Sequence, residues 1–122
     1  MKRQPRIKDE EHCEFIRSLP CISCHDNTST ECAHIRFSDI RVAKVNPGVG
    51  QKPDDKFTVP LCSSCHRRQH EMGRERDFWY LAHIDPILYA LALYAVSGDY
   101  EKGYQIVMMA GEIEPANILV DG

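Results

Sequence analysis

The chain has 122 residues, of which 43% are hydrophobic and 27% are charged, and its formal net charge is −3. These values fit one folded domain and exclude an intrinsically disordered chain. The most apolar stretch, residues 87–96, is much shorter than the roughly 20 residues that cross a bilayer. Residues 1–6 are basic but lack the apolar segment of a signal peptide. We therefore expect a cytoplasmic protein with no membrane segment, in which thiols stay reduced.

The charges are unevenly distributed along the chain. Residues 34–76 contain nine Lys and Arg against five Asp and Glu, a net charge of +4, whereas residues 77–122 come to −6. Phosphate binding needs a local cationic surface rather than a positive total charge, so a nucleic-acid partner stays compatible with this chain. The cations that we expect to contact phosphates are Arg36, Lys52, Lys56, Arg67 and Arg68.

Residues 1–19 are interpreted as an N-terminal extension. Within them, residues 11–19 contain Phe15, Ile16 and Leu19, a pattern that is compatible with a short helix or with a strand. The folded core is expected over residues 20–83.

The core begins with a tight turn at residues 20–25 and continues with two short strands and a helix. The alternating residues 32–37 predict a strand, and residues 57–61 predict a second one. Between them lies a loop rich in Gly and Pro that has no phosphate-binding pattern. A helix is predicted from near Cys65 to about residue 72, where Gly73 ends it. The order of elements is therefore strand, strand, helix.

Residues 84–122 are predicted to form a helical hairpin. One or two helical turns over residues 75–83 precede it. Asp85 and Pro86 are a good N-cap and first helical residue, and Asp99 caps a last helix that runs to Gly111. The hairpin is apolar and acidic, which suggests packing or a contact with a partner.

Four of the six cysteines form two C-x-x-C pairs, which is the pattern of a tetrahedral zinc site. These predicted ligands are Cys21, Cys24, Cys62 and Cys65. In a small chain, structural zinc supplies much of the folding free energy, on the order of 10 kcal/mol in isolated zinc peptides. Cys13 is interpreted as an idle buried thiol, and Cys32 as either a neighbour of the zinc site or an unrelated thiol. His25 is a candidate to hydrogen-bond a zinc-bound sulfur.

Three further histidines are candidates for chemistry. His66 and His70 lie four residues apart on the predicted helix, so both rings occupy one helix face. His34 lies in the first predicted strand. A divalent metal held by one or two imidazoles and a carboxylate keeps positions open for water and a phosphate oxygen, and a neutral histidine can activate that water. The remaining histidines, His12 and His83, are expected at the surface.

In these motifs the chain resembles the HNH, or ββα-metal, nuclease superfamily. More narrowly, it is similar to a phage and prophage group that contains RecA-dependent, Ref-type nucleases and their small relatives. The shared motifs cover about residues 20–80. They are Ala-His-Ile-Arg at 33–36, Gly-x-Gly-x-Lys-Pro-x-Asp at 48–55, Pro-Leu-Cys-x-x-Cys-His at 60–66 and Gln-His at 69–70.

The resemblance implies a role for each matching position. His34 falls at the water-activating base, His66 at the final metal ligand and His70 at an additional imidazole ligand. Ala33 stands where the superfamily usually has an acidic or histidine ligand, and the usual asparagine is replaced near Phe57. We expect Asp55 to compensate as a metal ligand or as the residue that orients the base, with Asp54 the weaker candidate. If neither reaches the metal, His34 is a ligand rather than the base.

We therefore expect an α+β protein with a small, zinc-braced ββα-metal (HNH, or His-Me finger) core and a C-terminal helical hairpin. The resemblance implies a DNA endonuclease that uses structural Zn²⁺ and a second divalent metal, Mg²⁺, Mn²⁺ or Zn²⁺. It also implies a role in phage recombination and contact with a recombinase filament. A zinc-ribbon module that binds nucleic acid without catalysis is the alternative. A protein-interaction adaptor acting through the hairpin is a weaker third reading.

Overall fold

The computed structural model describes residues 9–42 and 54–110 of the chain. Within these ranges the elements are α1 (Glu10–Arg17), β1 (Thr30–His34), a 3-10 helix η1 (Ile40–Val42), β2 (Thr58–Cys62), α2 (Ser63–Glu71), α3 (Glu75–Ala82), α4 (Pro86–Ala95) and α5 (Tyr100–Met109). This order confirms the predicted α+β class. In the same ranges, no helix has the length and apolarity needed to cross a bilayer.

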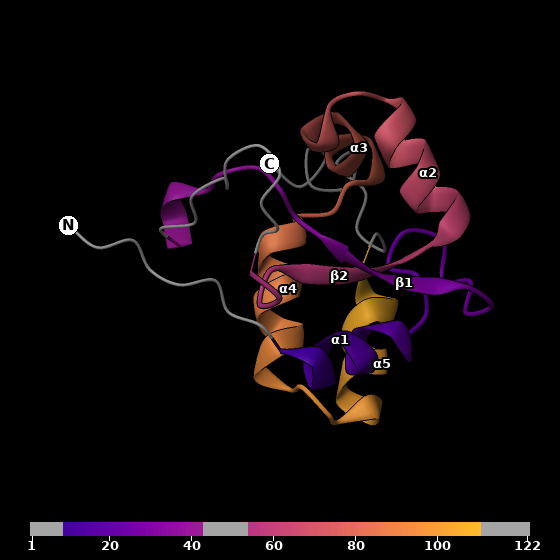
Figure 1. Cartoon of the computed structure of the whole chain (residues 1–122), viewed down its shortest axis with the longest axis vertical. Coiled ribbons are helices and arrows are strands. Elements are labelled where there is room, and N and C mark those ends of the chain that lie inside the picture. The colour runs from indigo at the N-terminus through magenta and orange to yellow at the C-terminus, as the bar shows by residue number, and fades with distance from the viewer. Residues whose placement is uncertain (1–8, 43–53, 111–122) are drawn as a thin grey trace, which may run out of the picture.

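The sheet consists of β1 and β2, which pair antiparallel with Thr30 opposite Cys62 and His34 opposite Thr58. The N–H of Ile35 extends the pairing to the carbonyl of Phe57 at 2.9 Å. The first strand therefore begins two residues before the predicted position and ends earlier, because pairing with β2 overrides the polar, turn-like composition of its first residues. The two strands cross the middle of the molecule (Figure 1).

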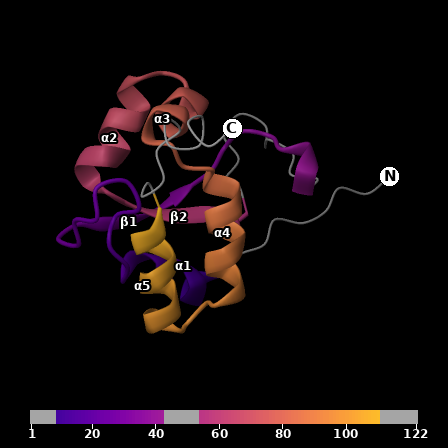
Figure 2. The same ribbon diagram turned by 180° about the vertical axis from the view of Figure 1, so that it is seen from behind.

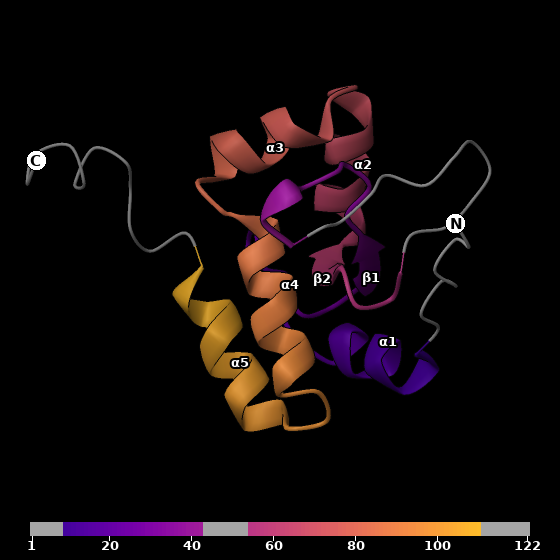
Figure 3. The same cartoon turned by 90° about the vertical axis from the view of Figure 1, so that its left-hand side faces the viewer.

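Helices cover the sheet on both sides. Helices α2 and α3 lie on one side, and α1, α4 and α5 lie on the other (Figures 1 and 3). All five residues of β2 are buried, as expected for a strand covered on both faces. Helix α2 begins at Ser63, with Cys62 as its N-cap, and Gly73 follows its end with a φ of 78°. The predicted stop at Gly73 is thus confirmed, because a positive φ favours glycine.

Helix α1 resolves the choice between helix and strand in residues 11–19. Asp9 caps it by accepting the N–H of His12, and Phe15 and Ile16 are buried. The helix packs against both strands and shares one hydrophobic core with them and with α4. The predicted surface position of His12 is wrong. Its ring is fully buried and lies 4.8 Å from the ring of Tyr94, because α1 presents this side to α4.

The predicted helical hairpin is formed by α4 and α5, which lie side by side (Figure 2). Both predicted caps are confirmed: Asp85 accepts the N–H of Leu88, and Asp99 accepts that of Lys102. Helix α4 contacts β2 as well as α5. In α5, Gly103 faces α1 so closely that a Cβ there would come within 2.7 Å of the Phe15 ring. The hairpin therefore completes the core on the α1 side of the sheet.

Candidate metal centre and histidine pocket

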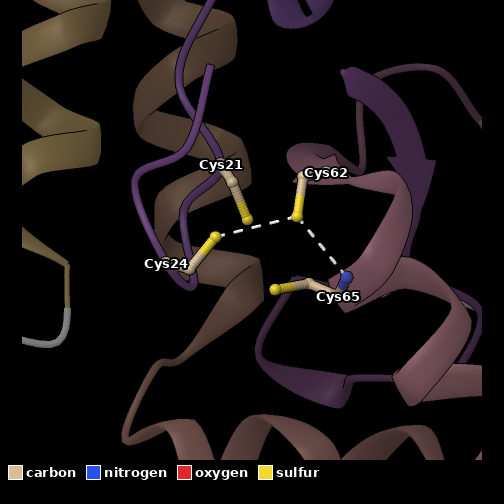
Figure 4. Close-up of side chains that lie close together, drawn as sticks. All are labelled: Cys21, Cys24, Cys62 and Cys65. Carbon is tan, nitrogen blue, oxygen red and sulfur yellow. Dashed lines mark hydrogen bonds between the residues drawn. The ribbon is translucent and has the colours of Figure 1, made fainter. Parts of the chain in front are cut away.

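Four cysteine sulfurs from two separate segments meet at one end of the sheet (Figure 4). We call Cys21, Cys24, Cys62 and Cys65 the cysteine cluster, and their sulfurs all lie within 4.8 Å of one another. The Cys24 and Cys62 sulfurs are 3.7 Å apart. Sulfurs around tetrahedral zinc, with Zn–S bonds of about 2.3 Å, are separated by about 3.8 Å. The residues present fit Zn²⁺, so the cluster could coordinate a zinc ion, as predicted.

Backbone hydrogen bonds bring the two halves of the cluster together. The N–H of Ile22 donates to the carbonyl of Pro60 at 2.8 Å and ties the first C-x-x-C turn to β2. His25, whose N–H donates to the carbonyl of Cys21, closes that turn with a φ of 67°. Three of the four cysteines are buried and Cys24 is exposed. The cluster is therefore built largely into the core, which is typical of a structural site.

Local hydrogen bonding distinguishes the thiols of the cluster. Burial raises the pKa of Cys24 and of Cys65. Burial also opposes ionisation of Cys62, but the N–H of Cys65 donates to its sulfur, and this bond together with the neighbouring thiols lowers the pKa of Cys62 overall. The thiolate is the form that binds metal. The N–H of Cys65 therefore favours the thiolate form of Cys62, at the junction of β2 and α2.

Two residues expected near the cluster have other surroundings. The buried Nε2 of His25 has no hydrogen-bond partner among the described residues. This nitrogen therefore makes no hydrogen bond to a cluster sulfur. Cys32 lies on β1 with its sulfur 3.0 Å from that of Cys13 on α1. It belongs to a separate thiol pair between the sheet and α1.

A pocket of about 310 Å³ lies along β1 between that strand and helices α2 and α3. We call it the histidine pocket. Its lining residues are Cys32, His34, Arg36, His66, Gln69, His70, Gly73 and Glu75. Helix α2 lies along β1 on one side of the pocket. The first turn of α2 meets Glu31, and beyond its end Glu75 accepts the N–H of Arg36 at 3.0 Å. The three predicted histidines thus line one pocket.

A buried carboxylate holds His34. Nε2 of His34 lies 2.7 Å from Oδ1 of Asp55, which is 4% exposed. The other oxygen of Asp55 accepts the N–H of Asp9 at 2.7 Å, so the N-cap residue of α1 fixes the carboxylate. The hydroxyl of Thr58 also donates to the backbone carbonyl of Asp55. A carboxylate in this position selects one tautomer and one orientation of the imidazole.

A second carboxylate holds His66. Nδ1 of His66 lies 2.7 Å from an oxygen of Glu31, and the hydroxyl of Ser63 donates to the other oxygen at 3.2 Å. The hydrogen bond with His66 lowers the pKa of Glu31, so this carboxylate stays ionised. The ring of His70 lies 4.8 Å from that of His66. A histidine held at Nδ1 by a carboxylate presents Nε2 to a metal, an arrangement common in metal sites.

Glu31 is not among the predicted site residues. The predicted first strand starts at Cys32, one residue after Glu31. Glu31 in fact lies on β1, opposite Leu61 of β2. Leu61 directly precedes the C-x-x-C turn that leads into α2. Extending the strand by two residues would have placed this carboxylate beside His66.

The structure places Asp55 with His34 and Cys13, all three donor atoms within 4.8 Å of one another. It does not place Asp55 with His66 and His70, the set predicted to hold the second metal. In the part of the chain that the structure describes, no equally tight cluster of three donors includes His66 or His70. The antiparallel register explains this separation. Asp55 precedes the residue paired with His34, whereas His66 follows the opposite end of β2.

The predicted phosphate-binding cations occupy different places. Arg36 lines the histidine pocket and is exposed. Arg68 instead donates to the Cys65 sulfur at 3.7 Å and lies over the ring of Phe78. Arg67 is exposed on α2, Lys56 lies over the ring of Phe57, and Lys52 falls outside the described residues. Arg36 is therefore the cation best placed to meet a ligand in the pocket.

The chain belongs to the family described as Protein of unknown function (DUF968), whose signature it matches over residues 1–83. Neither the curated proteins nor the solved structures contain a match to the chain. The matched range contains α1, both strands, α2 and α3, and therefore the cysteine cluster and the histidine pocket. It also contains residues 1–19, which were predicted to be an N-terminal extension, and it ends where the predicted hairpin begins.

Proposed function

We propose that this DUF968 protein is a metal-dependent endonuclease that hydrolyses DNA phosphodiester bonds, the activity implied by its resemblance to the HNH superfamily. One observation carries the proposal: His34, His66 and His70 line one open pocket, and a buried carboxylate holds His34 from behind. The order of the elements and their packing support the ββα-metal assignment. The strands β1 and β2 are antiparallel, and α2 follows β2 in the chain and contacts both strands.

His34 acts as the general base. A neutral imidazole that donates from Nε2 to Asp55 presents Nδ1 as a proton acceptor. His34 removes a proton from a water molecule while the water oxygen attacks phosphorus and the bond to the leaving oxygen breaks. The Asp55 carboxylate then stabilises the imidazolium. A positioned base of this kind contributes about 10²–10⁴-fold to the rate.

His66 and His70 would hold the second divalent cation. Glu31 fixes the His66 ring, and the two rings lie close enough on α2 to face one ion. When bound, the cation would supply Lewis-acid stabilisation of the phosphate and the leaving oxygen. Two imidazole ligands are compatible with Mn²⁺ and Zn²⁺, with water molecules completing the coordination, and Mg²⁺ would be held mainly through waters.

Arg36 would contact the DNA backbone. Its exposed side chain lines the histidine pocket. Arg36 also belongs to residues 34–76, the segment with a net charge of +4. A guanidinium matches the geometry of a phosphate. The phage recombination setting and the contact with a recombinase filament follow from the resemblance alone, as does the choice of DNA as the polymer.

The test is nicking of supercoiled plasmid DNA with Mg²⁺ or Mn²⁺. We expect cleavage by the wild-type protein and a loss of at least about 10²-fold in His34→Ala, with zinc content and circular dichroism unchanged. His83→Asn is the matched control. This histidine ends α3 with a φ of 61°, which asparagine tolerates, and it lies outside the pocket lining. Full activity in His34→Ala would overturn the assignment of the base.

A zinc-ribbon module that binds nucleic acid without cleaving it is the second candidate. The observation that favours it is the uneven supply of metal donors: four close donors in the cysteine cluster, and no third close donor with His66 and His70 in the described ranges. This module would bind one metal per chain and retain DNA without nicking it. Cleavage that depends on His34 and on a second metal would exclude it.

A further inference from the structure

Four side chains that can bind metal meet between β1, α1 and the residues before β2. Cys13 comes from α1, Cys32 and His34 from alternate positions of β1, and Asp55 from the turn that precedes β2. Donor atoms of Cys13, His34 and Asp55 lie within 4.8 Å of one another, and the Cys32 sulfur is 3.0 Å from that of Cys13. None of these residues belongs to the cysteine cluster.

The spacing of the Cys13, His34 and Asp55 donors is close to that of three ligands around one tetrahedral ion. The Cys32 sulfur adjoins this set through that of Cys13 but does not lie within 4.8 Å of all three donors. With bonds of about 2.0–2.3 Å, ligand atoms around zinc stand roughly 3.3–3.8 Å apart. The contacts of 2.7 Å between His34 and Asp55 and 3.0 Å between the two sulfurs are shorter, because hydrogen bonds now join these pairs. Insertion of an ion would spread each pair by less than about 1 Å.

The four side chains have two features of a metal site: an outer hydrogen bond that orients a ligand, and access from solvent. The N–H of Asp9 holds one oxygen of Asp55, which leaves the other oxygen as a single ligand. Outer contacts of this kind orient the ligands of metal sites. Cys32 and His34 also line the histidine pocket, so an ion has a path from solvent.

We propose that Cys13, His34 and Asp55, with Cys32 beside Cys13, form a second site for a thiophilic divalent metal such as Zn²⁺, and that metal binding there inhibits the protein. The binding site stands independently of the proposed function, and the inhibition rests on it. An ion between Nε2 of His34 and Oδ1 of Asp55 would take the place of the hydrogen bond that joins them. The neutral imidazole would then carry its proton on Nδ1, so Nδ1 could not accept a proton from water, and Asp55 would no longer orient the ring.

The ligand set separates this metal from the catalytic one. Thiolate ligands select Zn²⁺ and similar soft ions, whereas Mg²⁺ and Mn²⁺ prefer oxygen. The site therefore does not compete for Mg²⁺ or Mn²⁺ in a nicking assay that contains these ions, and it responds to free zinc. It can inhibit the protein only after the cysteine cluster has taken up its own zinc.

Cobalt absorption tests the site directly. Protein that carries its structural zinc is titrated with Co²⁺ without oxygen and with a phosphine reductant. We expect a thiolate-to-cobalt charge-transfer band at one equivalent while bound zinc stays at one per chain. His70→Ala should keep this band, because imidazole ligands at the other site contribute no sulfur. Cys13→Ser should weaken cobalt binding at least tenfold, since even outer-shell changes cost 10- to 100-fold.

The alternative outcomes overturn the site. No charge-transfer band in the wild-type protein would exclude it, whatever the nicking activity. A band that appears only as zinc is released, or that persists unchanged in Cys13→Ser, would assign the sulfur ligands to the cysteine cluster. If Cys13→Ser does not fold by circular dichroism, Cys32→Ser gives the same test from β1.

Nicking assays test the inhibition. Each protein is compared with itself without added zinc, and we expect the Zn²⁺ concentration for half-inhibition to rise at least tenfold in Cys13→Ser. An equal concentration in both proteins would overturn inhibition through this site. A cobalt band without any nicking under all metal conditions would leave the site in place and overturn the endonuclease instead.

Discussion

The cysteine cluster and the histidine pocket both take residues from the segment 62–70, but the first is a closed site and the second is an open one. In the cluster, four donors from two C-x-x-C turns face one another within 4.8 Å, and three of the four cysteines are buried. In the pocket, the histidines line an open volume of about 310 Å³, and their hydrogen-bond partners are carboxylates. Closed sites stabilise a fold, whereas open sites leave room for water and substrate.

The side chains of these two regions are fixed in place by different groups. Cluster residues would hold one another through a shared zinc ion, which their sulfurs lie close enough to coordinate. Pocket residues are held by groups outside the pocket: Asp9 and Asp55 behind His34, and Ser63 and Glu31 beside His66. Loss of a cluster residue should therefore unfold the protein, while loss of a pocket support should weaken activity in a folded protein.

The largest effect is expected from Cys62→Ser, which removes a zinc ligand and the sulfur that accepts the N–H of Cys65. Zinc binding in small domains contributes on the order of 10 kcal/mol, comparable to the whole stability of a domain. We expect loss of zinc and of helical circular dichroism. Cys13→Ser, at a buried cysteine outside the cluster, should keep one zinc per chain. A folded, zinc-loaded Cys62→Ser protein would contradict the structural role of the cluster.

Asp55→Asn should come next, with nicking reduced by roughly 10²–10⁴-fold. The amide keeps an oxygen for the N–H of Asp9 but loses the charge that supports the protonated His34. Plasmid nicking and the melting temperature are measured together, so that a loss of activity is separated from unfolding. Asp54→Asn makes the same change one residue earlier and serves as the control. Equal activity in the two variants would argue against the His34–Asp55 pair.

Glu31→Gln should have a smaller effect that high metal concentration rescues. Loss of an outer partner of a ligating histidine typically costs 10- to 100-fold in metal affinity. The metal concentration for half-maximal nicking should therefore rise by about that factor, while the rate at saturating metal changes less. Glu71→Gln, at an exposed position at the end of α2, is the control. If the metal dependence of Glu31→Gln is unchanged, His66 does not ligate through the arrangement described here.

The smallest effect is expected from His12→Gln, which replaces a buried histidine of α1 and changes how stability depends on pH. Burial lowers the pKa of His12, against the opposing influence of Asp9 and Asp55, and its ring contacts Ser97 and Tyr94. The unfolded chain then binds a proton more readily than the folded one, so stability is full above pH about 6.5 and falls as the pH drops below it. In His12→Gln this loss should be smaller.

Urea unfolding at about pH 7.5 and 5.5 measures the difference. The variant should be less stable at both values, because it loses the buried ring. Protonation of zinc-binding thiols affects both proteins alike, so only the difference between them reports on His12. An identical decline in stability would show that His12 does not titrate on unfolding.

Much of the fold could be predicted because its signals are local. Asp85 before Pro86, Asp99 before a helix, and Gly73 after one are caps whose chemistry acts within a few residues. The burial of His12 and the helical state of α1 could not be predicted in this way. They depend on contacts with Tyr94, Ser97 and the strands, which lie far away along the chain.

The cysteine cluster and the pairing of His66 with His70 could be predicted from the sequence alone, because fixed short spacings impose these geometries on any turn or helix. Which carboxylate contacts which histidine depends instead on the tertiary structure. The antiparallel register places Asp55 beside His34 and Glu31 beside His66 at opposite ends of two five-residue strands. It also brought Cys13 on α1 to Cys32 on β1, a contact that no spacing in the sequence encodes.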